Sequence, residues 1–242
     1  MAVVLEGTQT TSFTSGTSLT IALPAGVVEN DLILIAGVHE GAFALSTPTG
    51  YTQLVDEQAT DAYFGTNLCR FFVFYKIATS SESNPVTSST DNASDKRFIV
   101  HRFSGCNTGQ PLVLRGSGQD NVKKYQTPGF PPYFNIASCT TDSFDDELFR
   151  IAACNDNGDE GTLDNAQSFT GHTRRAILTG SEVGMISIQK NSVSAETVGA
   201  LQIDTISVVG GEVDAIAFAN IALREGTAGG GGGRSMMLLG VG

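Results

Sequence analysis

Apolar and polar residues alternate along much of this chain, in short stretches separated by polar turns. Leu19, Ile21 and Leu23 occupy one set of alternate positions, with Thr20 and Ala22 between them. Because successive side chains of a β-strand point to opposite faces, this period of two predicts a strand with one buried face. In the whole sequence we find no sustained apolar stripe with a period of 3.6 residues, which would predict an amphipathic helix. The pattern therefore predicts an all-β fold.

The predicted strands follow one another from one end of the chain to the other. Many are rich in β-branched and aromatic residues, which favour strands. Residues 213–223 are rich in alanine, which also suits a helix. We predict a strand there because this run completes the repeat described next. The other predicted strands are 18–23, 31–38, 51–57, 68–78, 97–103, 134–139, 147–154, 173–178, 183–190 and 198–209.

Four short segments of the first half recur in the second half in the same order, at offsets of roughly 114 to 121 residues. They are NDLILIA (30–36) with DELFRIA (146–152), TPTGYT (47–52) with SFTGHT (168–173), FVFYK (72–76) with ISIQK (186–190), and RFIVHRF (97–103) with DAIAFAN (214–220). One half alone would expose an apolar sheet face, whereas two halves can cover each other. The repeat therefore predicts a sandwich built from two pseudo-repeated halves.

We accordingly predict a single β-sandwich domain over residues 1–225. Its half-repeats lie at about 18–108 and 134–225, and a Pro- and Gly-rich crossover at 109–133 joins them. A glycine-rich arm at 226–242 follows the domain.

Three motifs of the first half resemble a jelly-roll module that recurs in virion proteins of tailed bacteriophages. The first is a turn of the form Pro-x-Gly-x-x-x-x-Asp-Leu, the second a Pro-x-Gly-aromatic-Thr loop, and the third a strand end before a proline. Tyr51 stands in the aromatic slot, where the family often has tryptophan. The resemblance covers roughly residues 18–223 and implies a jelly-roll fold, a place in the virion and no catalytic residues. Its motif residues are Pro24, Gly26, Asp31 and Leu32; Pro48, Gly50, Tyr51 and Thr52; and Phe103, Ser104, Gly105 and Pro111.

Charge and composition narrow the range of partners. The formal net charge is −11 and the pI is about 4.6, so the surface repels phosphate and we expect no direct binding of nucleic acid. No apolar run approaches the roughly 18–20 residues of a membrane-spanning helix, and the first residues lack the features of a secretory signal. Cys69 and Cys154 fall in apolar strand-like runs, which predicts buried thiols and fits synthesis in a reducing host cytoplasm.

Among the residues that could bind a metal ion, the sequence predicts at most a weak calcium site. The histidines His39, His101 and His172 are scattered, and His101 lies in an apolar strand where packing is the simpler role. An acidic loop at 153–165 has the oxygen ligands that calcium prefers, but it does not fit the EF-hand spacing, and a solvated hairpin loop is the alternative. We expect no cofactor. The calcium candidates are Asn155, Asp156, Asn157, Asp159 and Asp164.

Two further groups invite comparison with enzymes and lectins. Asp145 and Asp146 form an acid pair of the kind that glycoside hydrolysis needs, yet Asp31 precedes the equivalent strand of the first half, so a turn role explains them. Gly116, Ser117 and Gly118 lack the spacing of a serine-nucleophile motif and predict a flexible turn in the crossover. Three loop aromatics could stack on a sugar ring or anchor their loops. They are Tyr51, Tyr63 and Phe64.

The last residues, GTAGGGGGRSMMLLGVG, combine a glycine run with a short apolar segment. Glycine adopts backbone conformations that other residues resist, and apolar side chains beyond it gain free energy by burial. We predict that this arm docks on a neighbouring subunit; the alternative is that it folds back on its own domain. The predicted docking residues are Arg234, Met236, Met237, Leu238, Leu239 and Val241.

Taken with the resemblance, these features predict a structural protein of a phage virion rather than an enzyme. We expect a decoration, cement or adaptor protein that is assembled in the host cytoplasm and attached to the capsid or tail through contacts with other virion proteins. We also expect a homo-oligomer, with a trimer as the first guess. The alternative is a receptor-binding module of a tail fibre that recognises a host-surface glycan.

Overall fold

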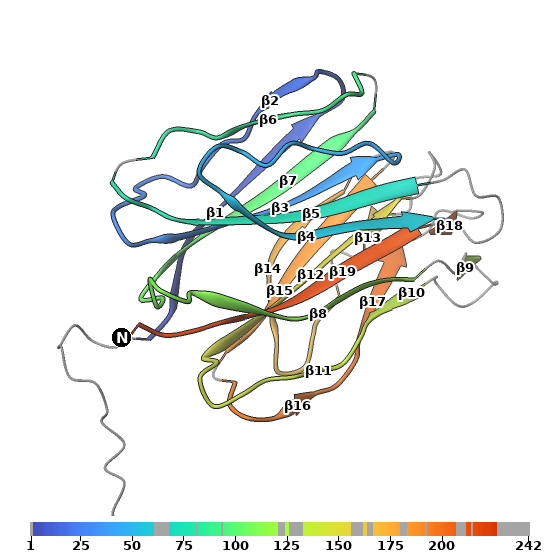
Figure 1. The fold of residues 1–242 in the computed structure, drawn as a ribbon. Coiled ribbons are helices and arrows are strands. Elements are labelled where there is room, and N and C mark those ends of the chain that lie inside the picture. The colour runs from blue at the N-terminus through green and yellow to red at the C-terminus, as the bar shows by residue number, and fades with distance from the viewer. Residues whose placement is uncertain are drawn as a thin grey trace, which may run out of the picture.

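The computed structural model consists of two antiparallel five-stranded sheets that pack face to face (Figure 1). It describes residues 2–60, 68–80, 82–92, 94–120, 124–125, 133–155, 162–163, 167–179, 183–191, 193–206, 212–213 and 215–226.

Each sheet is formed by one half of the chain, so the blue-to-green strands of the first sheet lie over the second sheet, in which β8 is green and the other strands run from yellow to red (Figure 1). The first sheet has the order β1 (Val4–Phe13), β7 (Lys96–Ser104), β3 (Leu32–Glu40), β5 (Leu68–Ile77) and β4 (Thr52–Thr60). The second has the order β8 (Leu112–Asp120), β19 (Ala215–Leu223), β12 (Glu147–Asn155), β15 (Val183–Asn191) and β14 (Thr173–Leu178).

Short strands cover the outer faces of these sheets. They are β2 (Ser18–Thr20) with β6 (Val86–Ser88), β11 (Cys139–Thr140) with β16 (Thr197–Val198), and β10 (Tyr133–Ile136) with β17 (Leu201–Ile206) and β13 (Thr162–Leu163). A further pair joins β9 (Lys124–Tyr125) to β18 (Glu212–Val213).

The sequence repeat is also a structural repeat. Strands β1, β7, β3, β5 and β4 correspond in order to β8, β19, β12, β15 and β14. The edge strands β4 and β14 each carry a bulge at the same place, between Gln53 and Val55 and between Arg174 and Ala176. A lysine of the next strand makes an equivalent ion pair of 2.6 Å in each half. These pairs are Lys76 with Glu82 and Lys190 with Glu196. The agreement confirms the predicted all-β sandwich of two repeated halves.

Three layers of apolar side chains explain why the central strands are buried on both faces. The inner layer lies between the sheets and joins residues of β3, β5 and β7 to residues of β12, β15 and β19. A second layer fills the space between the first sheet and β2, and a third fills that between the second sheet and β10, β17 and β13. Every residue of β12 and β19 is consequently buried.

Each run that the sequence predicts to be a strand contains a strand in the structure, although some of the boundaries differ. The alanine-rich run predicted at 213–223 contains β19 (Ala215–Leu223), while Val213 belongs to β18. The run at 134–139 ends its first strand at Ile136, and the run at 198–209 divides into β16 and β17. Cys69 and Cys154 are buried thiols, as predicted.

The crossover prediction was wrong in one respect, because 109–133 contains the full edge strand β8. Gly116 and Ser117 pair there with Asn220 and Ala219 of β19 instead of forming a flexible turn. Gly118 lies so close to β19 that an added Cβ would sit 3.0 Å from the Phe218 ring. Glycine in a strand often marks such a close approach. The jelly-roll connectivity and the cooperative unfolding of the two halves as one domain stay predictions.

Candidate functional site

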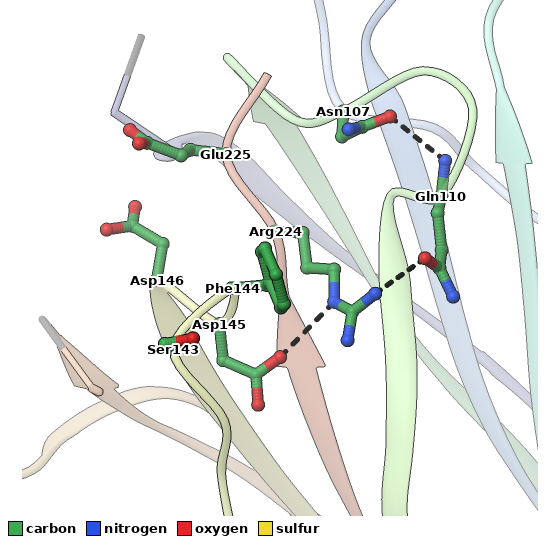
Figure 2. Close-up of a pocket in the computed structure, with 8 residues that line it drawn as sticks. All are labelled: Asn107, Gln110, Ser143, Phe144, Asp145, Asp146, Arg224 and Glu225. Carbon is green, nitrogen blue, oxygen red and sulfur yellow. Dashed lines mark hydrogen bonds and ion pairs between the residues drawn. The ribbon is translucent and has the colours of Figure 1, made fainter. Parts of the chain in front are cut away.

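A pocket of about 860 Å3 opens at the end of the second sheet where β8 begins and β19 ends (Figure 2). Three segments far apart in the sequence meet there, because β19 pairs with β8 on one side and with β12 on the other. We call it the Phe144 pocket. Its lining residues are Asn107, Gln110, Ser143, Phe144, Asp145, Asp146, Arg224 and Glu225.

An aspartate turn builds the floor of this pocket just before β12. The Asp142 backbone N–H donates to Asp145 Oδ2 at 3.0 Å, and the Asp145 N–H donates to the Asp142 carbonyl at 3.2 Å. The first half has the same turn before β3, where the Val28 N–H donates to Asp31 Oδ2 at 2.9 Å. The turn role proposed for Asp145 from the sequence therefore matches its hydrogen bonds.

Two arginines hold the aspartates of the turn in a fixed frame. Arg115 of β8 donates from Nε to Asp145 Oδ2 at 2.7 Å and from Nη2 to Oδ1 at 2.8 Å. Arg224 Nη2 donates to Asp142 Oδ2 at 2.9 Å. Arg115 also contacts the Asp142 carboxylate, and this hydrogen bond lowers the pKa of Asp142 below its usual value. Paired guanidinium–carboxylate contacts of this kind are strong and directional.

These contacts decide what the acid pair can do. The Asp145 side chain is fully buried, and the guanidinium groups of Arg115 and Arg224 both contact its carboxylate. Asp146 also lines the pocket, with Oδ2 accepting the Val3 backbone N–H at 3.1 Å. The two acids therefore differ in their partners: the Asp145 carboxylate is bound by two arginines, whereas Asp146 accepts a backbone N–H.

The open side of the pocket presents an aromatic ring. Phe144 is 71% exposed, and the Arg224 guanidinium carbon lies 5.8 Å from its ring centroid, within the range of a cation–π contact. Figure 2 shows the ring between Asp146 on one side and Arg224 on the other.

The loop aromatics proposed from the sequence do not converge on this pocket. Tyr51 is half-buried against the apolar layer under β2, its hydroxyl is buried without a hydrogen-bond partner among the described residues, and burial raises its pKa. Lys76 Nζ lies 5.8 Å from the Tyr51 ring. Tyr51 therefore anchors its loop, while Tyr63 and Phe64 lie outside the described residues.

The calcium candidates are mostly outside the described residues as well. Asn155 is buried at the end of β12, whereas Asp156, Asn157, Asp159 and Asp164 are not described. In the described ranges, no group of three or more His, Cys, Asp or Glu side chains is placed to hold a metal ion. The calcium site stays a prediction.

The three histidines lie apart in separate surroundings. His101 is enclosed between the sheets, His39 bonds through Nε2 to Ser89 Oγ at 2.9 Å, and His172 sits in the turn before β14. The packing role predicted for His101 agrees with its complete burial.

Sequence reasoning missed four residues that line the pocket, Phe144, Arg224, Asn107 and Gln110, and it missed Arg115, which binds the aspartate turn. Phe144 had one available signal: it is an aromatic residue inside the polar turn TTDSFDDE, where a buried role is not expected. The predicted docking residues Arg234, Met236, Met237, Leu238, Leu239 and Val241 lie outside the described part of the chain.

Comparisons with known proteins found no matching family model, no matching curated protein and no matching solved structure. Along the part of the chain that the structure describes, no helix has the length and apolar character needed to cross a membrane.

Proposed function

We propose that this protein is a non-catalytic structural component of a bacteriophage virion, a decoration, cement or adaptor protein attached to the capsid or tail. The observation that carries the proposal is the way in which the charged groups at and beside the Phe144 pocket bind one another. Asp142, Asp145, Arg115 and Arg224 are bound to one another, so they form a rigid frame for contact rather than a set of reactive groups.

The motifs behind the phage resemblance support this reading, because they hold turns of the fold. Gly26 has a φ of +76°, a conformation that favours glycine, and an added Cβ would lie 3.0 Å from Arg102 Nη1. Arg102 in turn donates from Nε to Asp31 Oδ2 at 2.6 Å. The turn before β3 is therefore bound to β7 at residues that carry the resemblance.

Attachment to other virion proteins is assigned to the arm at 226–242. Removing the residues after Gly226 tests this assignment. The truncated protein should keep its melting temperature and lose oligomerisation or incorporation into particles. A lower melting temperature with unchanged assembly would show that the arm serves its own domain instead.

A second candidate function is favoured by the exposed Phe144 ring. A receptor-binding module for a host-surface glycan would present an aromatic ring beside polar groups, as this pocket does. Figure 2 shows amide, carboxylate and guanidinium groups around that ring.

A further inference from the structure

The amide groups of the Phe144 pocket are held with their donors unused. Asn107 Oδ1 accepts the backbone N–H groups of Gly109 at 2.9 Å and Gln110 at 3.0 Å. Gln110 Oε1 accepts a hydrogen bond from the Arg224 guanidinium. Backbone N–H groups and a guanidinium only donate, so these contacts fix which end of each amide is oxygen. Both NH2 groups remain as donors at the pocket, since no contact among the described residues engages them.

The other side of the ring offers acceptors. Figure 2 shows Asp146 and Glu225 on the side of Phe144 away from Gln110. Asp146 Oδ2 accepts the Val3 N–H, which leaves Oδ1, and the exposed Glu225 carboxylate has no side-chain partner among the described residues. Acceptors and donors therefore flank the ring from opposite sides.

The Phe144 ring supplies an apolar surface between them. Arg224 covers it from one direction at 5.8 Å, and the exposure of 71% leaves most of the ring available to a ligand. The face of an aromatic ring carries partial negative charge, so it attracts the C–H groups on the flat side of a pyranose.

These three features together select a class of ligand. A sugar hydroxyl both donates and accepts, so a pyranose stacked on Phe144 can use the amides at one edge and the carboxylates at the other. A lysine or arginine side chain only donates and would leave the amide donors of Asn107 and Gln110 unused. An acidic sugar would meet the carboxylates of Asp146 and Glu225, which no arginine neutralises in the described contacts.

We propose that the Phe144 pocket binds a neutral hexopyranose, presented as a unit of a surface glycan. This site goes beyond the structural role in the virion and would serve the second candidate function. It rests on the pocket alone, so the two proposals can fail separately.

Saturation-transfer NMR on the full-length protein tests the site, with methyl glucoside, methyl galactoside and methyl mannoside as probes. Methyl glucuronide and arginine amide serve as the acidic and basic comparators. We expect at least one neutral glycoside to bind with a Kd on the order of 1 mM, which suits a ligand of this size, and we expect both comparators to bind at least tenfold more weakly.

Variants separate the three kinds of contact. Phe144→Ala should weaken binding at least tenfold, and Glu225→Gln should weaken it severalfold. Asn107→Asp and Gln110→Glu keep the oxygens that accept the internal hydrogen bonds and replace only the NH2 donors, so each should weaken binding about tenfold without loss of fold. Phe43→Ala is the matched control, because Phe43 is also exposed, at 44%, but lies outside the pocket; it should bind as the parent does.

Three results would overturn the site. One is the absence of any neutral-glycoside signal up to about 50 mM. The second is binding of arginine amide in preference to the sugars, which would assign the pocket to a basic side chain of a protein partner. The third is equal weakening by Phe144→Ala and Phe43→Ala. None of them bears on the virion role, which is tested by the position of the protein in the particle.

Discussion

His101 of β7 and Ser187 of β15 join the two sheets through a hydrogen bond of 2.8 Å between Nε2 and Oγ. The other ring nitrogen, Nδ1, lies 2.9 Å from Thr8 Oγ1 on β1, and the ring centroid lies 5.1 Å from that of Phe149. The side chain is wholly buried. Burial, with a smaller contribution from the Arg175 charge, lowers the pKa of His101 to about 3, so the ring is neutral in the folded protein at pH 7.

The pKa of His101 predicts acid sensitivity of the fold. The unfolded chain takes up a proton near pH 6.5 and the folded protein only near pH 3, so the His101 contribution is fully present above pH 6.5. It should fall by about 1.4 kcal/mol per pH unit between pH 6.5 and 3. Urea unfolding at pH 7.5, 6, 5 and 4 measures this slope.

His101→Gln is the control for that slope, since glutamine cannot titrate. Glu147 acts in the opposite sense, because burial raises its pKa to about 7, and its proton stabilises the fold most at low pH. Both proteins contain Glu147, so the difference between their slopes isolates the histidine. Equal slopes would contradict the assignment of a buried neutral His101.

The inner apolar layer predicts unequal effects at two phenylalanines of the second half. Phe149 is buried, with its ring centroid 4.8 Å from that of Phe103 on the facing sheet. Phe149→Ala should lower the free energy of unfolding by about 3–5 kcal/mol. Phe144→Ala should change it by less than about 0.5 kcal/mol, because Phe144 is 71% exposed. Denaturant unfolding of both variants makes the comparison, and similar losses would disprove the predicted layer.

The repeat predicts that neither half is stable alone. A chain of residues 1–125 keeps the first sheet. It loses β19, which pairs with β8, and the residues of the second sheet that form half of the inner layer. That chain should aggregate or remain unfolded on expression. A soluble fragment with a cooperative thermal transition would show that the halves are independent domains.

The strands were predictable from the sequence because most are apolar runs bounded by polar turns, and the central ones are continuously apolar since both of their faces are buried. β8 was missed because Gly116 and Gly118 signal a turn in sequence, whereas in the fold glycine admits the Phe218 ring of β19. Arg150 shows a related limit. It lies fully buried within β12, where Nε donates to Asn220 Oδ1 at 2.9 Å and Nη1 to the Gly199 carbonyl at 2.9 Å. A charged residue at such a position becomes interpretable only with its acceptors known.

The pocket was beyond sequence analysis for a topological reason. Asn107, Phe144 and Arg224 belong to segments that are brought together only by the pairing of β19 with β8 and β12. Local spacing cannot reveal such a site. The sequence repeat did reveal Asp145 as a turn residue, because the equivalent Asp31 precedes β3 in the same hydrogen-bonded turn.

The most direct test of the proposed virion role is a cryo-electron microscopy map of the particles assembled from the genome that encodes this protein. We predict density for the two-sheet sandwich in regular copies on the capsid or tail, in contact with neighbouring virion proteins. A well-resolved particle map that lacks the sandwich, with the protein found only free in the lysate, would contradict it.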